Sequence, residues 1–188
     1  MTDRLLQARE SLLKRIRRTR MSTTPGDAML LRILIQTARA RRGIEVGVFA
    51  GYGAIHMGIA FERTGGRLYS LEIDPKRAAT AQSNVRQAGL EKTVAVLCGD
   101  ALELIPRLRG RFDFLFLDAV KRDYLRYLKA AEPKLKPGAV VVADNVIVHA
   151  SEMRDFLRYI RTSPNYETVL VRASMEKGDG MTVSLKLR

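Results

Sequence analysis

Short apolar runs alternate with helix-length segments along most of the chain, and this alternation constrains the fold more than any other feature. The runs 114–117 and 140–142 are apolar at every position, as in strands that a parallel sheet buries on both faces. Such runs, separated by helix-length segments, predict an α/β fold with a doubly wound, mostly parallel sheet. Strands are expected at 44–48, 68–71, 94–97, 112–117 and 139–143, and helices at 28–41, 54–62, 75–88, 101–108 and 124–134.

Two further strand-like runs, 166–173 and 181–187, follow a helix expected at 151–161. An Asp-Gly dipeptide lies between the two runs, and this dipeptide is typical of hairpin turns. The last two of seven strands are therefore expected to be antiparallel. The chain has 188 residues without an internal repeat or linker, so residues 1–188 are expected to form a single domain.

The positive charge is concentrated in the first quarter of the chain. The net charge is +13, and residues 1–42 hold 11 basic and 3 acidic residues. Residues 1–20 are expected to form a basic amphipathic helix, because Leu5, Leu12 and Ile16 fall near helical spacing. This apolar stripe would pack on the body of the protein or on a second subunit. A basic segment favours acidic partners such as nucleic acid, but it also suits a solvated helix without a partner.

The cysteine content favours a cytoplasmic location. Cys98 is the only cysteine, which excludes a disulfide framework and a cysteine-based zinc site. At the end of a strand it is expected to be a small buried apolar residue. The longest uncharged run, 46–61, has 16 residues and four glycines, whereas a membrane span needs about 20 mostly apolar residues. No membrane partner is expected.

A glycine-rich loop follows the first expected strand, where ligands of open α/β sheets bind. The loop begins at Glu45 and contains Gly47, Gly51 and Gly53. Glycines let the backbone approach a ligand, and the next helix presents free N–H groups to an anion. The spacing is G-x-x-x-G-x-G rather than the G-x-G-x-x-G of dinucleotide-binding enzymes, which disfavours a pyrophosphate site.

The next two strand ends favour a nucleoside ligand. The second strand ends at Glu72, whose carboxylate can accept hydrogen bonds from both hydroxyls of a ribose. The third is followed by Asp100 and Ala101, where the carboxylate or the neighbouring backbone could contact an adenine edge. Strand-end acids and glycine turns are common in proteins, so the order of these residues along the sheet carries the prediction.

A second group of polar residues follows the fourth and fifth strands. Asp118 ends one strand, and Asp144 and Asn145 end the next. Two carboxylates and an amide oxygen form a hard donor set that suits Mg²⁺. Lys121 lies three residues after Asp118 and could act there as a general base. The alternative is that these residues only cap turns and helices.

These motifs together resemble the metal-dependent O-methyltransferases, the group of the catechol and caffeoyl-CoA O-methyltransferases that use S-adenosylmethionine (SAM). The resemblance covers about residues 21–187 and rests on Glu-Val-Gly-Val-Phe-Ala-Gly-Tyr-Gly, Leu-Glu-Ile-Asp-Pro, Gly-Asp-Ala, Asp-Ala-Val-Lys-Arg-Asp-Tyr and Ala-Asp-Asn-Val. It implies the Rossmann-like, seven-stranded class I SAM-methyltransferase sheet. Within the family, the Asp…Lys…Asp-Asn set is specific to the metal-dependent group.

The resemblance also implies a role for each site residue. The methionine end of the SAM pocket would be shaped by Glu45, Gly47, Gly51 and Gly53. The ribose would be bound by Glu72, and the adenine by Asp100 and Ala101. Mg²⁺ or another divalent cation would be held by Asp118, Asp144 and Asn145; Asp118 would also border the cofactor, and Lys121 would be the base. The implied reaction is methyl transfer from SAM to a hydroxyl of a catechol-like acceptor whose vicinal oxygens chelate the metal.

Some positions depart from the family pattern. The family loop usually reads Gly-Tyr-Ser where this chain has Gly53, so one hydroxyl contact to the SAM carboxylate is missing. The chain has no Trp to form a wall for an aromatic acceptor. Met21 is a candidate to cover the reactive methyl group, and His149 is a candidate to touch the acceptor. The family also suggests a homodimer.

One alternative function stays open at this point. Some bacterial members of the group methylate a hydroxylated uridine in tRNA, and the basic segment 14–20 could then contact RNA phosphates. This segment lacks the aromatic residues that commonly stack on bases.

Overall fold

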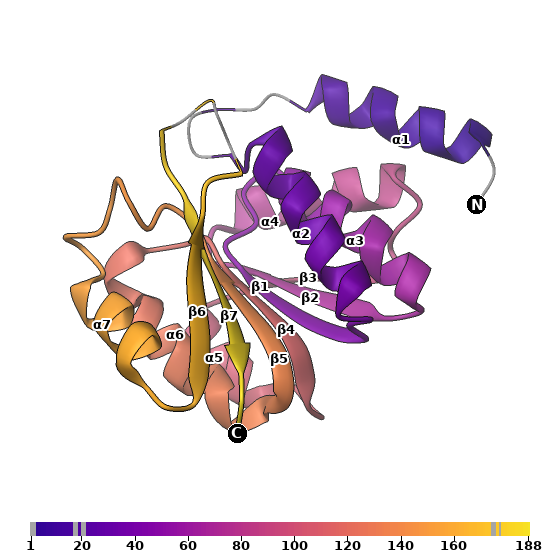
Figure 1. Cartoon of the computed structure of the whole chain (residues 1–188). Coiled ribbons are helices and arrows are strands. Elements are labelled where there is room, and N and C mark those ends of the chain that lie inside the picture. Colours follow the sequence, from indigo (N-terminus) through magenta and orange to yellow (C-terminus); the bar gives the residue numbers. More distant parts are fainter. Residues whose placement is uncertain (1–2, 17–18, 20–21, 174–175, 177) are drawn as a thin grey trace.

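A seven-stranded sheet forms the centre of the computed structural model, which describes residues 3–16, 19, 22–173, 176 and 178–188 (Figure 1). The strand order is β3-β2-β1-β4-β5-β7-β6. β1 to β5 are parallel, and β7 runs antiparallel between β5 and β6. This arrangement confirms the predicted fold class. The strands are β1 (Arg42–Val46), β2 (Arg67–Glu72), β3 (Val94–Cys98), β4 (Phe112–Leu117), β5 (Leu135–Ala143), β6 (Tyr166–Val171) and β7 (Met181–Lys186).

Helices cover both faces of the sheet (Figure 1). One layer packs into a core with α2, α3 and α4, and the other with α5, α6 and α7. Residues of β4 alternate between the two cores: Phe114 and Phe116 enter the first, and Leu115 and Leu117 the second. This double burial explains why the strand lacks polar alternation. The helices of the two layers are α2 (Pro25–Thr37), α3 (Tyr52–Thr64), α4 (Pro75–Gln87), α5 (Ala101–Arg107), α6 (Tyr124–Ala131) and α7 (Arg154–Thr162).

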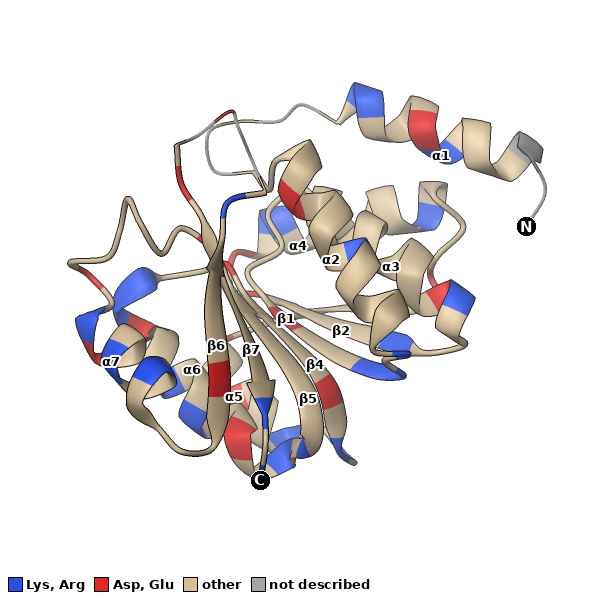
Figure 2. Cartoon of the chain, in the orientation of Figure 1, with Lys and Arg blue, Asp and Glu red and all other residues tan. Residues whose placement is uncertain are grey.

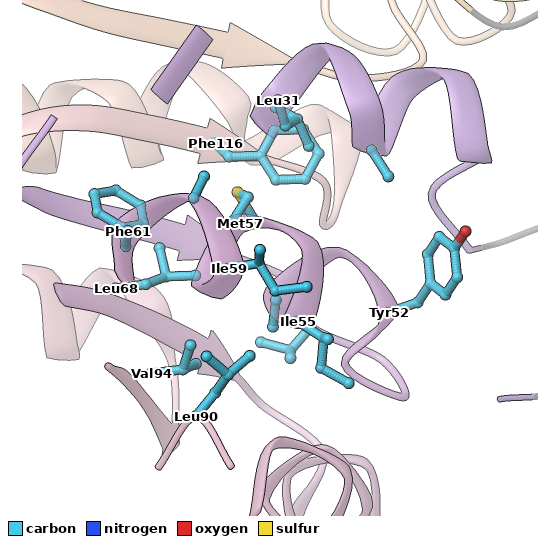
Figure 3. Close-up of a cluster of buried hydrophobic side chains, with 14 of the residues drawn as sticks. Leu31, Tyr52, Ile55, Met57, Ile59, Phe61, Leu68, Leu90, Val94 and Phe116 are labelled. Atoms are coloured by element: carbon cyan, nitrogen blue, oxygen red, sulfur yellow. The ribbon is translucent and has the colours of Figure 1, made fainter. Parts of the chain in front are cut away.

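The core on the α2–α4 side is densely packed around α3. Leu31 of α2 and Phe116 of β4 lie on one side of Met57, and Phe61 lies near Leu68 of β2 (Figure 3). All five side chains are fully buried. A polar N-cap starts α2, where the backbone N–H of Asp27 donates to the Thr24 hydroxyl. The packing of α2 and α3 in this core fixes the N-terminal ends of these two helices relative to the ends of the strands.

The N-terminal helix α1 (Asp3–Arg15) packs on the body of the protein. Its Leu12 is buried in the core of the α2–α4 layer. Arg9 is only 2% exposed; its guanidinium donates to both Glu62 oxygens at 2.7 and 3.0 Å and to the Ala88 carbonyl at 2.8 Å. Because Ala88 caps α4, the cation also lies at the negative end of a helix dipole. The later part of the predicted basic segment lies largely outside the described residues.

The observed elements differ from the predictions in a few places. The helix predicted at 124–134 ends at Ala131 and continues as a 3₁₀ turn, Glu132–Lys134, because Pro133 has no N–H to extend an α-helix. Cys98 is exposed, so its predicted burial was wrong. It ends β3, the strand at the edge of the sheet, where no further strand covers it. No helix in the described part of the chain is long and apolar enough to cross a membrane.

Candidate active site

A cavity of about 380 Å³ opens at the carboxyl ends of the central strands. It lies where the strand order changes direction between β1 and β4, the expected ligand site of a doubly wound sheet. Both groups of sequence-predicted residues reach this cavity. Those that line it are Glu45, Gly47, Gly53, Glu72, Asp118, Lys121 and Asn145.

The glycine loop needs glycine at Gly47. This residue has φ +91°, and a Cβ there would collide with the backbone carbonyl of Asp118. Its N–H continues the sheet ladder by donating to the Leu71 carbonyl at 2.9 Å. The first strand and the Asp118 turn therefore meet in direct backbone contact.

Two buried carboxyl groups form the floor of the cavity. Glu72 accepts backbone hydrogen bonds from Val48 and Phe49 at 3.0 and 2.9 Å, so it holds the glycine loop in place. Glu45 is 2% exposed and accepts a hydrogen bond from the Ser70 hydroxyl at 2.5 Å. Burial raises the pKa of the Glu45 carboxyl to about 8, although the Ser70 hydrogen bond opposes this shift.

Three predicted cofactor residues do not line the cavity. Gly51 has φ +85° and packs against Ala81 of α4. Asp100 is the N-cap of α5 and accepts from the Leu102 N–H at 2.8 Å, and Ala101 is buried beneath it. Asp100 and Ala101 follow the outer strand β3, so they stand beside the Glu72 end of the cavity rather than inside it.

Lys121 is held between two groups from different elements. Its Nζ lies 3.0 Å from Asp118 Oδ1 and donates to the Tyr124 hydroxyl at 2.8 Å. The Tyr124 hydroxyl in turn donates to the Asp144 carbonyl at 3.2 Å. Tyr124 is fully buried, and its ring packs edge-on against Phe156 of α7. The lysine is thus fixed over the two strand ends by a tyrosine that the motif analysis did not single out.

Asp118 and Asp144 come from neighbouring parallel strands in register. Leu117 of β4 pairs with Ala143 of β5, so the next residue of each strand ends at the same edge. Asp144 is 2% exposed. Burial, followed by repulsion from Asp118 and Asp27, raises the pKa of the Asp144 carboxyl well above its usual range.

Asn145 completes the donor set at a strained turn. It has φ +61°, and its amide nitrogen donates to Asp179 at 3.1 Å. Asp179 also accepts from the Ile147 and Val148 N–H groups, so the turn is pinned to the segment before β7. The amide oxygen of Asn145 is a suitable metal ligand.

The donor set fits a hard divalent cation. A cation beside Asp144 would offset the repulsion between the acids, and all its donors would be oxygens. Among the described residues no three His, Cys, Asp or Glu side chains cluster as a metal centre. A metal bound here would therefore need the Asn145 oxygen in addition to Asp118 and Asp144.

The sequence analysis missed several cavity residues. Ser22 and Thr23, just before α2, line the cavity, as does Arg77 of α4. A Cβ at Gly53 would lie 3.1 Å from Thr23 Oγ1, so this hydroxyl stands beside the loop position that lacks one. The only available signal was the Ser-Thr-Thr run before Pro25, and such a run predicts a helix cap rather than a cavity wall.

His149 borders the cavity next to Asn145. Its Nδ1 lies 2.6 Å from Glu152 Oε1, and its backbone N–H donates to the Asn145 carbonyl. The other candidate for this region, Met21, lies outside the described residues.

Comparisons with known proteins show the family to which this chain belongs. The family model for O-methyltransferase matches residues 2–187. A catechol O-methyltransferase from Niastella koreensis is 40% identical over 77% of this chain and 66% of its own length. One from Mycobacterium tuberculosis is 30% identical over 88% of this chain and 81% of its own.

Solved structures extend the likeness to the whole fold. The structure of an O-methyltransferase from Bacillus cereus in complex with SAH superposes with a TM-score of 0.86 at 26% identity, over 99% of this chain and 92% of that one. The chain spans less than two thirds of the Niastella koreensis protein and 56% of a catechol O-methyltransferase from Mus musculus. The family match, the sheet order and the strand-end residues place this chain in the O-methyltransferase family.

Proposed function

We propose that the protein is a SAM-dependent, divalent-metal-dependent O-methyltransferase that methylates a hydroxyl of a catechol-like small molecule. One observation carries the proposal: a single cavity joins the glycine loop and Glu72 to Asp118, Lys121 and Asn145. A cofactor side and a metal side thus face each other across one space. The related SAH complex and the catechol enzymes support both halves.

The cofactor would lie along the ends of β1, β2 and β3. Glu72 would accept hydrogen bonds from the ribose, and Asp100 and Ala101 would border the adenine beyond it. Glu45 would stand near the positively charged methionine end, where a cation stabilises the ionised form of its carboxyl group. Gly47 and Gly53 would let the backbone approach the ligand closely, Gly51 would permit the turn between them, and Asp118 would border both the cofactor and the metal.

Asp118, Asp144 and Asn145 would hold the metal, Mg²⁺ being the natural choice for oxygen donors. Such an ion lowers the pKa of an acceptor hydroxyl that it binds. Lys121 would take the proton of that hydroxyl on Nζ, and the acceptor oxygen would attack the methyl group of SAM in line. The carbon–sulfur bond breaks, its electron pair stays on sulfur, and SAH leaves. The chain mainly holds oxygen and methyl in line, which can contribute several kcal/mol.

The proposal is tested by transfer of labelled methyl groups from SAM to a panel of catechols, with Mg²⁺ or with EDTA. Asp144→Ala is expected to abolish transfer while SAH binding stays within about threefold of wild type. Lys121→Ala is expected to slow transfer by about 10²–10⁴-fold. Asp155→Ala, an exposed acid on α7, is the matched control and should transfer normally. Transfer that persists in EDTA, or equal loss of SAH binding in Asp144→Ala and the control, would refute the metal assignment.

The tRNA alternative is not favoured. The relatives include a catechol and a caffeoyl-CoA O-methyltransferase, and these names point to small acceptors. Bulk tRNA in the same assay would detect the alternative as label in the RNA fraction. We also propose a homodimer, supported by the exposed apolar side chains Met29 and Ile33, which lie one turn apart on α2. The cytoplasmic location and the single-domain organisation remain predictions from the sequence.

A further inference from the structure

Three turns of the chain each carry two exposed arginines at the end of the sheet remote from the cavity. These six residues, the arginine cluster, come from the connections before β1, β2 and β4. Because the three strands are neighbours in the order β2-β1-β4, their amino ends lie side by side. The cluster consists of Arg39 and Arg41, Arg63 and Arg67, and Arg109 and Arg111.

Direct hydrogen bonds hold the three turns together. The Arg67 N–H donates to the Arg41 carbonyl at 2.8 Å. The Arg42 guanidinium donates to the Arg109 carbonyl at 2.6 Å. Figure 2 shows the resulting concentration of blue ribbon where β1 and β2 begin. Residues that are about 70 positions apart in the sequence therefore form one surface.

The arginine cluster is not neutralised by the protein. None of its six side chains forms an ion pair with a carboxylate in the described part of the chain. The nearby acid Asp113 accepts from the Arg41 and Arg42 N–H groups and pairs with Lys136. Elsewhere on the surface Arg126 has an acidic partner, whereas the α7 arginines Arg154, Arg158 and Arg161 form no ion pair within the described residues. The cluster thus has a local excess of positive charge.

The chemistry of the surface distinguishes between two kinds of acidic partner. Protein interfaces need apolar or aromatic anchors at their centre, but the exposed large hydrophobic residues of the described chain all lie outside these three turns. Nucleic-acid interfaces are polar and strongly basic. Arginine also binds phosphate oxygens in a bidentate manner. The composition of the arginine cluster therefore favours phosphates.

The spacing agrees with a nucleic-acid backbone. Two strand spacings of about 4.8 Å separate the outer turns, so the cluster spans roughly 10 Å before its side chains spread. A duplex carries one charge per about 1.7 Å of axis, or about six charges over this length. We infer that the arginine cluster binds the phosphate backbone of a nucleic acid, without base specificity and away from the methyl-transfer cavity.

The test uses the full chain and a fluorescently labelled 20-bp DNA duplex, with an RNA duplex of the same sequence as a second probe. Binding is measured by anisotropy from 50 to 300 mM NaCl. A cluster that neutralises six phosphates gives a slope of log K against log salt of about −5 on DNA. The triple variant Arg39→Gln/Arg41→Gln/Arg109→Gln should bring the slope to about half that value and weaken binding at least tenfold at 100 mM NaCl.

A second triple variant is the matched control. Arg154→Gln/Arg158→Gln/Arg161→Gln removes three exposed charges from α7 and changes the net charge equally. It should change the slope by less than one. Both variants should retain catechol methylation, because none of the six positions belongs to the candidate active site. Equal losses in the two variants would show that only net charge matters and would overturn the inference. Polyglutamate that competes as well as duplex at equal charge would overturn it in favour of an acidic protein partner.

Discussion

We predict that Thr23 supplies the hydroxyl that the glycine loop lacks, and exchanging the two positions tests this arrangement. A Cβ at Gly53 would lie 3.1 Å from Thr23 Oγ1 and 3.2 Å from Glu45 Oε1, closer than the ordinary contact range, which starts at 3.4 Å. Gly53→Ser therefore overpacks the loop, which typically costs about 1–3 kcal/mol. We expect the loop to relieve this overlap by leaving its binding conformation, and a shift that costs the same free energy corresponds to about 5- to 150-fold weaker SAH binding. Thr23→Ala removes the hydroxyl that we predict to bind the ligand carboxylate and should weaken binding by about 10- to 150-fold.

The double variant Thr23→Ala/Gly53→Ser should bind SAH within about threefold of wild type. The introduced serine then occupies the space that the threonine leaves and replaces its hydroxyl. Titration calorimetry with SAH gives the four affinities of the cycle, and thermal unfolding of each variant checks the fold. Thr23→Ser keeps the hydroxyl and should bind almost normally. If the two single losses simply multiply in the double variant, the positions act independently and the reasoning is wrong.

Three further variants probe the groups around the cavity. Tyr124→Phe removes the hydroxyl that accepts a hydrogen bond from Lys121. In steady-state kinetics, kcat should therefore fall about tenfold while KM for SAM stays constant. A rise in KM alone would contradict the positioning role of Tyr124. Burial lowers the pKa of His56 to about 4, so the unfolded chain binds a proton below pH 6.5 that the folded protein resists, and the contribution of His56 to stability should fall by roughly 2 kcal/mol from pH 6.5 to 5. The buried Glu45 and Asp144 carboxyls contribute in the opposite direction over this range, because their pKa values are raised. The unfolding free energy of wild type minus that of His56→Met, from urea unfolding, should therefore fall by this amount; a difference that does not change with pH would contradict the prediction. Arg9→Met leaves the Glu62 carboxylate and the Ala88 carbonyl without their hydrogen-bond donor. The free energy of unfolding, measured in urea, should fall by about 2–4 kcal/mol. A decrease of less than about 0.5 kcal/mol would show that contacts other than those of Arg9 hold α1 on the protein.

The strands and the metal-side residues could be predicted because their signals are local. The segment 112–117, whose last four residues are all apolar, is most stable at the centre of a sheet, and it forms β4 with those bounds. Asp118 and Asp144 each follow such a run, and parallel strands end at one edge, so their approach needed no further information. The same reasoning brought Lys121 to the site through its spacing from Asp118.

The residues that sequence analysis missed depend on contacts between distant segments. Asp179 was interpreted only as part of a hairpin turn, yet its carboxylate pins the Asn145 turn. Thr23 was interpreted as a helix cap, and only the packing of α2 against α3 brings it beside Gly53. The charge count assigned Arg39 to a basic N-terminal region, whereas the fold places it next to turns from later in the chain.

The pin between Asp179 and the Asn145 turn has a consequence for how the protein is made. The two residues are 34 positions apart, and the chain leaves the ribosome from its N-terminus onward. The parallel half of the sheet can therefore assemble while the Asn145 turn still lacks the carboxylate that holds its strained backbone. Until β7 inserts between β5 and β6, a nascent chain would have a formed glycine loop but an unfinished acceptor side. Competence to bind the cofactor should thus appear earlier in biosynthesis than competence to transfer its methyl group.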